Sequence, residues 1–271
     1  MNIVRLGAVG YLNARPLVYG LDARPEFALR FDVPSRCADL LHEGAIDLGL
    51  IPSIEYLRGE NLSVVPSLAI ASRGPVASVA IYTTKDMADV RSIALDTSSR
   101  TSVALVSVLC ARAFRIKPDL APAAPNLSAM LKTADAALMI GDIALFQSAS
   151  EARRTDEGPQ PAVQKIDLGE LWTRMTGLPF VYAFWAGRKG VVSAEHVQAL
   201  RAARDAGVRK PQEIASAYYP DSADRQAMAV RYLQDNIKYH LGDEERAGVE
   251  LFHRYAADAG VVRAARPLSF Y

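Results

Sequence analysis

The sequence lacks the features that mark several large classes of protein. It has only two cysteines, Cys37 and Cys110, each in an apolar stretch, which predicts reduced core thiols and not a disulfide framework. No apolar run approaches the roughly 20 residues of a membrane-spanning helix. The N-terminal segment carries an early charge at Arg5 and has no continuous apolar run, so it predicts a first strand and not a signal peptide. These absences predict a cytoplasmic protein without a membrane partner.

Net charge is also nearly absent. Lys and Arg number 31 against 30 Asp and Glu, which gives a formal net charge of +1. Such a chain has no overall positive field to attract nucleic acid, so any bound anion must be held by local groups. We therefore expect no nucleic-acid partner.

Histidines are few, and the motifs of common cofactor sites are missing. No two of the four histidines, His42, His196, His240 and His253, share helical ligand spacing with a nearby carboxylate or thiol. The chain contains no G-x-S-x-G nucleophile elbow and no Walker loop, and the segment Gly7–Gly10 lacks the third glycine of a dinucleotide fingerprint. We expect neither a metal nor an organic cofactor.

The chain does contain a regular alternation of strand-like and helix-like runs. Ile3–Val9, Phe27–Val33 and Ile46–Ile51 are strand-like, and each is followed by a helix-like run. A second alternation begins at Ser92–Asp96 and includes Ala136–Ile140. This pattern is typical of an α/β fold with a largely parallel sheet.

The C-terminal third predicts helices without strands. They are Ser193–Ala206, Pro211–Tyr218, Ser222–Tyr239 and Asp243–Ala257. We predict a discontinuous first lobe, residues 1–84 with 186–271, into which a second lobe, residues 85–185, is inserted. The apolar run Leu178–Ala186 would return the chain to the first lobe, and the polar segment Ser150–Pro161 predicts an exposed loop.

Two segments resemble each other. In Ala45–Leu57 and in Ala134–Phe146, a strand ends at an isoleucine, a small or turn residue follows, and a helix begins at once. Each half could carry the same βα corner, although two generic corners can also look alike by chance. Ligands of such α/β folds bind at the carboxyl ends of strands, which places the candidate site in the cleft between the lobes.

The loop from Asp96 to Ser102 is a candidate anion site. It joins a strand to a helix, where unpaired backbone N–H groups and the helix dipole favour an anion. Hydroxyls of Ser98, Ser99 and Thr101 could add donors. Ordinary N-capping by one serine is the alternative.

Further candidates follow other strands. In Tyr11-Leu12-Asn13-Ala14-Arg15-Pro16, Asn13 and Arg15 could face the ligand, or they could be a helix cap and a solvated charge. The repeated corner would bring Ser53 and the Gly141-Asp142 pair to the same cleft, again with capping as the alternative.

Five strings carry a resemblance to a known family: GAVGYLNARPL, IDLGLIPSIEY, ALDTSSRTSVAL, DAALMIGDIAL and DLGELWTRMTGLPFVYAFWA. In order along Leu6–Ala186, they resemble the chorismate dehydratases of the futalosine route to menaquinone. The resemblance implies a two-lobed, periplasmic-binding-protein-like (type II) α/β fold. The enzymatic alternative is a sister family on the same scaffold, the dihydroxynaphthoate synthase of the same pathway. It differs in the first loop, where a Pro-x-Asn-Asp type string would replace Tyr11–Arg15.

The resemblance implies that chorismate, a dicarboxylate, loses water to give 3-[(1-carboxyvinyl)oxy]benzoate without a metal or cofactor. Ser98, Ser99 and Thr101 would bind the ring carboxylate and stabilise a dienolate-like transition state. Asn13 would be catalytic, holding the leaving hydroxyl or the enolpyruvyl arm. The other substrate-binding candidates are Tyr11, Arg15, Ser53, Gly141 and Asp142.

The proton acceptor stays open. The carboxylates near the cleft loops are Glu55, Asp96 and Asp142, and the enolpyruvyl carboxylate of the substrate is another option. Two non-enzymatic functions also remain for such a fold: a receptor that clamps a small carboxylate, and the effector-sensing half of a regulator.

Overall fold

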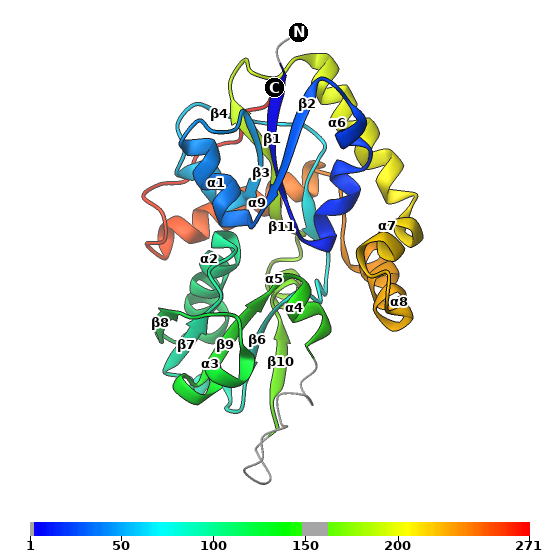
Figure 1. Cartoon of the computed structure of the whole chain (residues 1–271). Coiled ribbons are helices and arrows are strands. Elements are labelled where there is room, and N and C mark those ends of the chain that lie inside the picture. Colours follow the sequence, from blue (N-terminus) through cyan, green and yellow to red (C-terminus); the bar gives the residue numbers. More distant parts are fainter. Residues whose placement is uncertain (1–2, 148–161) are drawn as a thin grey trace.

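The structure of the chain is a computed structural model that describes residues 3–147 and 162–271. The loop predicted at Ser150–Pro161 lies outside these ranges. Figure 1 shows two lobes, each built around a β-sheet with helices packed against it. We call the lobe that contains the N-terminal strand the first lobe and the other the second lobe.

The first lobe contains a six-stranded sheet of order β2-β1-β3-β11-β4, with β5 beside β11. Its strands are β1 (Val4–Val9), β2 (Phe27–Asp32), β3 (Leu48–Pro52), β4 (Leu62–Val64), β5 (Ile70–Ser72) and β11 (Phe180–Arg188). β1 pairs in parallel with β2 and β3, whereas β11 pairs antiparallel with β3, β4 and β5. Because β3 is buried throughout and β11 nearly so, the core of this lobe lies around them.

The second lobe contains a five-stranded sheet of order β10-β6-β9-β7-β8. Its strands are β6 (Val79–Thr83), β7 (Ser92–Leu95), β8 (Asp119–Pro122), β9 (Ala136–Ile140) and β10 (Gln164–Asp167). β7 pairs in parallel with β8 and β9, and β6 pairs antiparallel with β9 and β10.

Short helices follow most of these strands. In the first lobe they are η1 (Leu12–Val18), η2 (Leu21–Ala23), α1 (Pro34–His42) and η3 (Ser53–Leu57). In the second lobe they are η4 (Met87–Asp89), α2 (Arg100–Leu109) with its wider last turn η5 (Cys110–Phe114), α3 (Leu127–Thr133), α4 (Gly141–Phe146) and α5 (Leu168–Thr176). Cys37 and Cys110 are free and buried.

The two sheets share one design. Each has three parallel strands, β2-β1-β3 or β8-β7-β9, followed by one antiparallel strand, β11 or β6. The corners β3–η3 and β9–α4 therefore occupy equivalent positions, which confirms the βα corner predicted to occur in both halves. Residues at the carboxyl ends of β1, β3, β7 and β9 line one cavity between the lobes.

The chain crosses between the sheets earlier than the predicted boundaries. β6 lies in the second sheet, although residues up to 84 were expected in the first lobe, and β11 begins in the first sheet at Phe180, although residues up to 185 were expected in the second. The crossings are instead between β5 and β6 and between β10 and β11. Both β6 and β11 are largely apolar, so their composition does not indicate which of the two sheets each will join.

One carboxylate connects the two crossings. Asp167 ends β10 and caps α5, where it accepts the N–H of Glu170 at 3.0 Å. It also accepts the N–H of Val76 at 3.0 Å and that of Ala77 at 2.6 Å in the first crossing. Ala77 has a φ of 64°, a left-handed conformation that costs a non-glycine residue about 1–2 kcal/mol. Asp167 therefore holds this segment in its shape.

The C-terminal helices belong to the first lobe, and the first two of them pack against η1. They are α6 (Ala194–Val208), α7 (Pro211–Tyr218), α8 (Ala223–Arg231) with its last turn η7 (Tyr232–Asn236), and α9 (Asp243–Asp258). All four predicted helices are present, although Ser222–Tyr239 ends at Asn236. A Cβ at Gly207 of α6 would lie 2.3 Å from the carbonyl oxygen of Pro16, so only glycine permits this close packing on η1.

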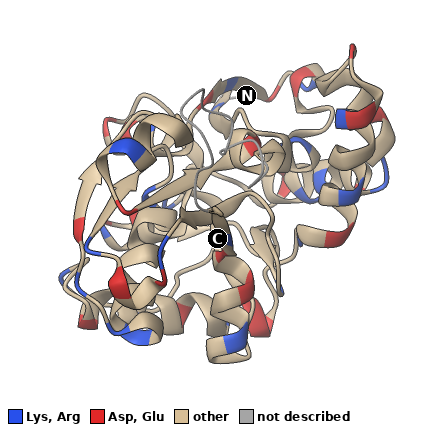
Figure 2. Ribbon diagram, turned by 90° about the horizontal axis from the view of Figure 1, so that it is seen from below, with Lys and Arg blue, Asp and Glu red and all other residues tan. Residues whose placement is uncertain are grey.

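The surface carries both signs of charge. Figure 2 shows Lys and Arg interspersed with Asp and Glu over both lobes. In residues 3–147 and 162–271, no helix is long and apolar enough to cross a membrane.

Candidate active site

A small cavity lies between the lobes, where the carboxyl ends of the parallel strands meet. Its volume is about 30 Å³. The polar residues that line it are Tyr11, Asn13, Ser78, Ser99, Ser102 and Tyr182. The remaining lining residues are apolar or glycine, and they include Pro52, Ile140 and Gly141. Of the residues predicted from sequence, Tyr11, Asn13, Ser99 and Gly141 are thus brought together here.

The N-terminus of α2 points its first residues at this cavity. Ser99 is the N-cap residue, but its side chain makes no capping hydrogen bond, so the capping alternative does not apply to it. Ser102 donates to the Ser99 hydroxyl at 3.2 Å. Residues three apart in a helix share one face, so these two hydroxyls reach the cavity beside the first backbone N–H groups. Together they present hydrogen-bond donors to the cavity.

Ser53 and Thr101 lie outside the cavity. The Thr101 hydroxyl accepts the N–H of Ile54 at 3.2 Å and lies 3.4 Å from that of Ser53. Ser53 donates to the carbonyl of Val181 at 2.8 Å, and both Ser53 and Thr101 are fully buried. Their hydrogen bonds join α2 to the first lobe, and neither residue lines the cavity.

The Asn13 amide faces the cavity with one unused atom. Its carbonyl oxygen is buried and has no hydrogen-bond partner in the described part of the chain. Its neighbour is Tyr232, whose hydroxyl is hydrogen-bonded to that of Ser78 at 2.7 Å. Burial raises the pKa of Tyr232, and the Asn13 amide partly offsets this increase. The free acceptor of Asn13 fits a hydroxyl group of a ligand.

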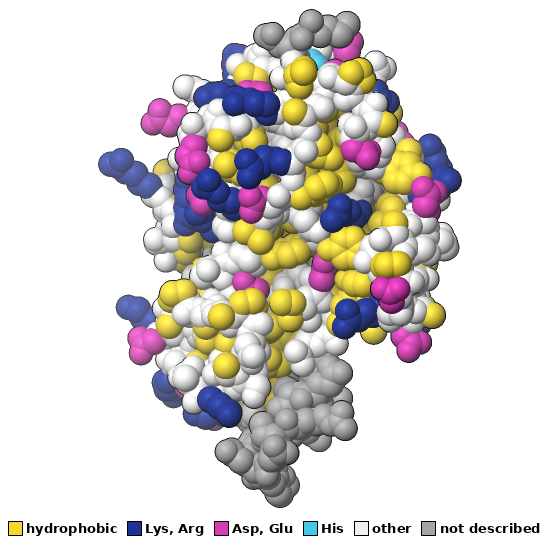
Figure 3. Space-filling model, in the orientation of Figure 1, with side chains coloured by type: hydrophobic (Ala, Val, Ile, Leu, Met, Phe, Trp, Pro, Cys, Tyr) yellow, Lys and Arg dark blue, Asp and Glu magenta, His cyan; other side chains and the backbone are white. Residues whose placement is uncertain are grey.

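Tyr11 separates the cavity from a larger hollow at the cleft mouth. This hollow has a volume of about 670 Å³, and Tyr11 and Ile140 line both spaces. The Tyr11 ring packs directly on Gly141, where a Cβ would lie 2.9 Å from Tyr11 Cε2. Burial raises the pKa of Tyr11, and the adjacent Ser98 hydroxyl, which lines the mouth, opposes the change. Figure 3 shows apolar side chains gathered on this face near the junction of the lobes.

Asp142 joins the lobes at the mouth. Its carboxylate accepts the N–H of Leu12 at 3.1 Å and the hydroxyl of Tyr218 at 2.6 Å. Burial raises the pKa of Asp142, although both hydrogen bonds favour the ionised form. The side chain lines the mouth and not the inner cavity.

The other two candidate bases, Glu55 and Asp96, make contacts that stabilise the fold. Glu55 is buried and contacts His42 at 3.3 Å, Arg58 at 2.6 Å and Arg100 at 3.2 Å. Burial alone would raise the pKa of Glu55, but these three partners outweigh it and lower the pKa. Asp96 accepts the backbone N–H of Ser98 at 2.9 Å and so fixes the loop before α2.

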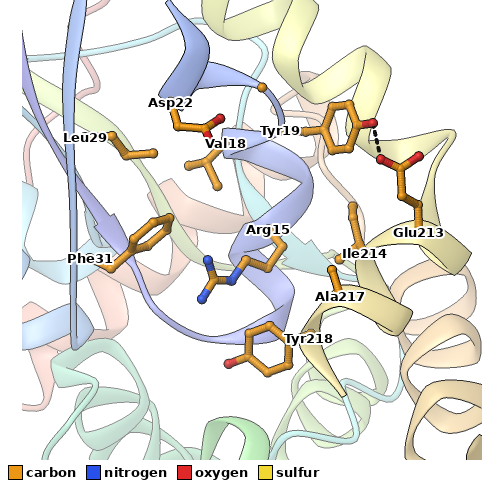
Figure 4. Close-up of a pocket in the computed structure, with 11 residues that line it drawn as sticks. Arg15, Val18, Tyr19, Asp22, Leu29, Phe31, Glu213, Ile214, Ala217 and Tyr218 are labelled. Carbon is orange, nitrogen blue, oxygen red and sulfur yellow. Dashed lines mark hydrogen bonds between the residues drawn. The ribbon is translucent and has the colours of Figure 1, made fainter. Parts of the chain in front are cut away.

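Arg15 also lies apart from the cavity. Its guanidinium donates to the carbonyl of Gly10 at 3.2 Å and stacks between the rings of Phe31 and Tyr218. These residues line a separate hollow, shown in Figure 4. The structure therefore does not bring Arg15 together with Asn13 and Ser99 around the cavity.

The residues that line the cavity include no ionised side chain. The titratable groups among its lining residues are Tyr11 and Tyr182, and burial raises the pKa of both. In residues 3–147 and 162–271, no group of three or more His, Cys, Asp or Glu could hold a metal ion. Sequence analysis missed Ser78 and Tyr182, because both lie in or beside apolar strand-like runs. It also missed Ser102, although the i, i+3 spacing from Ser99 was a usable signal.

The sequence matches the protein family described as menaquinone biosynthesis over residues 4–258. The chain belongs to this family. A chorismate dehydratase of Thermus thermophilus is 32% identical over 255 residues, which cover 91% of this chain and 93% of that protein.

Solved structures of other proteins have the same fold as this member of the menaquinone biosynthesis family. A protein of Archaeoglobus fulgidus has a TM-score of 0.74 at 15% identity, covering 96% of this chain and 98% of its own. A Candida albicans protein, described as having the generic periplasmic binding protein fold, has a TM-score of 0.66 at 12% identity, covering 98% of this chain and 92% of its own. The predicted two-lobed, periplasmic-binding-protein-like α/β fold is confirmed.

The Tyr11 contact can be tested with two matched glycines of this family member. Gly141 and Gly177 have φ values of 70° and 74°, but a Cβ at Gly177 would meet nothing within 4 Å. Both Gly141→Ala and Gly177→Ala should lose about 1 kcal/mol of unfolding free energy to backbone strain. Gly141→Ala should lose about 1–3 kcal/mol more, because the new methyl group displaces Tyr11. Urea unfolding measures both, and equal losses would show that Tyr11 yields without cost.

Proposed function

We propose that this chain is a chorismate dehydratase that converts chorismate to 3-[(1-carboxyvinyl)oxy]benzoate and water. Membership of the menaquinone biosynthesis family and the dehydratase relative support this activity. The observation that carries it is the content of the cavity: the N-terminus of α2, with its hydroxyl and N–H donors, lines the same cavity as the unused acceptor of Asn13, and no lining residue is an ionised acid or base. Such a site suits a substrate that supplies its own charges.

The ring carboxylate binds at the start of α2 in this proposal. Backbone N–H groups and the hydroxyls of Ser99 and Ser102 donate to it. When the ring carbon that bears the ether loses its proton, negative charge spreads through the adjacent double bond onto this carboxylate. Donors already in place stabilise that charge more than the ground state, and this difference lowers the barrier.

Asn13 positions the group that leaves. Its free carbonyl oxygen accepts a hydrogen bond from the ring hydroxyl next to the ether carbon. The enolpyruvyl carboxylate takes the proton from the ether carbon, the C–O bond to the hydroxyl breaks, and the proton passes to the departing hydroxide to form water. Because the new double bond completes an aromatic ring, positioning is the main task of the protein.

Substrate entry requires the lobes to separate. A cavity of about 30 Å³ is far smaller than the roughly 300–1,000 Å³ of ordinary ligand pockets. Entry through the mouth moves Tyr11 away from Gly141 and breaks the contacts that Asp142 makes with the first lobe. Movement of this kind is common for clefts between two lobes.

The activity can be tested directly with purified protein and chorismate in the presence of a chelator. We expect an aromatic product with the mass of chorismate less one water, followed by ultraviolet absorbance and mass spectrometry. Tight binding of chorismate without conversion would instead identify a carboxylate receptor. Conversion that requires an added divalent ion would contradict the metal-free mechanism.

The anion site predicts a clear difference between serines of the same helix. Ser99→Ala and Ser102→Ala should each lower kcat/KM about 10- to 100-fold, because a hydrogen bond to a charged group contributes about 1.5–3 kcal/mol. Ser107→Ala is the matched control, since that hydroxyl bonds within α2, to Val103. Steady-state kinetics of the three variants tests this prediction. Equal effects at all three positions would mean a loss of helix stability and no contact with substrate.

The proton acceptor can be identified by single-turnover kinetics of three variants. Asn13→Ala should lower the rate constant about 100-fold or more, by loss of positioning. Glu55→Gln should lose stability but keep the rate constant, because Glu55 is enclosed by its cationic partners. Asp142→Asn should weaken closure of the lobes, because the carboxylate that accepts from Leu12 and Tyr218 is lost, but it should keep the rate constant once chorismate is bound. A carboxylate variant that binds chorismate normally but loses several powers of ten in rate would refute substrate-assisted proton removal.

A further inference from the structure

We infer that the chain carries a second anion site, outside the cleft, for a single-ring aromatic carboxylate. The site is a hollow of about 600 Å³ bounded by η1, β2 and α7 (Figure 4). Arg15 and Tyr218 lie at one end of it and Asp22 at the other. The proposal concerns binding at this hollow and does not depend on which reaction occurs in the cleft.

Arg15 supplies a charge that no carboxylate contacts directly, although it acts on Asp142 from a distance and helps to lower the pKa of that group. Within residues 3–147 and 162–271 it forms no ion pair, and its Nε is buried without a hydrogen-bond partner. Its Nη2 bonds to Gly10, which leaves other N–H groups of the guanidinium free. A guanidinium offers its N–H groups as a planar fork that matches the two oxygens of a carboxylate. A half-buried, unpaired Arg15 is therefore best satisfied by a bound carboxylate.

Two aromatic rings hold the Arg15 guanidinium in a fixed orientation. Its guanidinium carbon lies 4.4 Å from the centroid of the Phe31 ring and 4.9 Å from that of Tyr218. Stacking between two rings fixes the plane of the guanidinium, so a ligand meets a rigid fork. Phe31 is 43% exposed, which is unusual for a large aromatic side chain and leaves part of its ring available for contact.

The walls of the hollow select an apolar ring. They comprise Val18, Leu29, Phe31, Ile214 and Ala217. None of the nearby acidic residues pairs with Arg15. Glu213 is engaged by Tyr19 at 2.6 Å and by Lys210 at 3.0 Å, and Asp22 lies at the opposite end of the hollow. Asp142 is held directly by Leu12 and Tyr218. A ring carboxylate fits with its charge toward Arg15 and its ring between β2 and α7.

The hollow is separate from the cleft but adjoins it at one residue. Tyr218 lines both the hollow and the cleft mouth, and its hydroxyl bonds to Asp142 of the second lobe. None of the residues that line the inner cavity lines this hollow. Variants can therefore distinguish a ligand bound here from one bound between the lobes.

Benzoate is the probe, and benzamide is its uncharged counterpart of similar shape. Isothermal titration of the full chain should give a dissociation constant for benzoate on the order of 1 mM, a typical affinity for so small a ligand. Arg15→Gln should weaken binding at least tenfold, and so should Ala217→Phe, which fills the hollow from its exposed wall. Arg30→Gln is the matched control, because it removes a positive charge from β2 beside Phe31 at a residue that does not line the hollow.

The outcomes separate the sites. Benzoate affinity within about twofold of the parent in Arg30→Gln and in Ser99→Ala, together with its loss in both hollow variants, supports the second site. Loss in Ser99→Ala with retention in Arg15→Gln would place benzoate in the cleft and overturn the proposal. Equal binding of benzamide and benzoate, or no heat of binding at concentrations about tenfold above the expected constant, would also overturn it. Circular dichroism of each variant confirms that loss of binding is not loss of fold.

Discussion

The arrangement of the cleft depends on the hydrogen bonds of one buried carboxylate, that of Asp142. The side chain belongs to the second lobe, and it accepts from the backbone of η1 and from the hydroxyl of Tyr218 in the first. Burial makes ionisation costly, so the carboxylate is stable as an ion only while its two donors remain. Separating the lobes removes those donors but admits water at the same time. The cost of opening is thereby reduced, because Asp142 exchanges one set of donors for another.

The charged residues near the cleft neutralise one another in ion pairs. The groups that line the cavity are therefore uncharged dipoles, N–H and hydroxyl groups among them. Arg100, the first residue of α2, pairs with Asp39 at 2.7 Å and with Glu55 at 3.2 Å in the first lobe. The charge of Arg100 is therefore neutralised by ion pairs that hold α2 against the first lobe. What lines the cavity is the helix start, with its N–H groups and the hydroxyls of Ser99 and Ser102. Fixed dipoles of this kind stabilise developing charge without rearranging during the reaction.

Local sequence patterns were enough to predict the elements and the ends of strands where the site lies. The alternation of runs predicted the α/β lobes, and the likeness of Ala45–Leu57 to Ala134–Phe146 predicted equivalent corners. The boundaries were wrong because β6 and β11 pair with strands distant in sequence, and their apolar composition suits either sheet. Residue type indicated the loops that line the cavity, but side-chain direction did not follow from it. Ser99 and Thr101 are two apart in the α2 start and so face different ways, one to the cavity and one to Ser53.

The contacts of Asp167 have a mechanical consequence. Two separate stretches of chain join the lobes, and two independent joints would allow the lobes to twist as well as swing. Asp167 binds the backbone of Val76 and Ala77 in one stretch while capping α5 in the other, so a single carboxylate fastens the two joints together. Any movement of one lobe against the other must therefore carry the two stretches together or break the hydrogen bonds of Asp167. Breaking these hydrogen bonds would also let Ala77, which is held at a strained φ of 64°, relax to an ordinary backbone conformation.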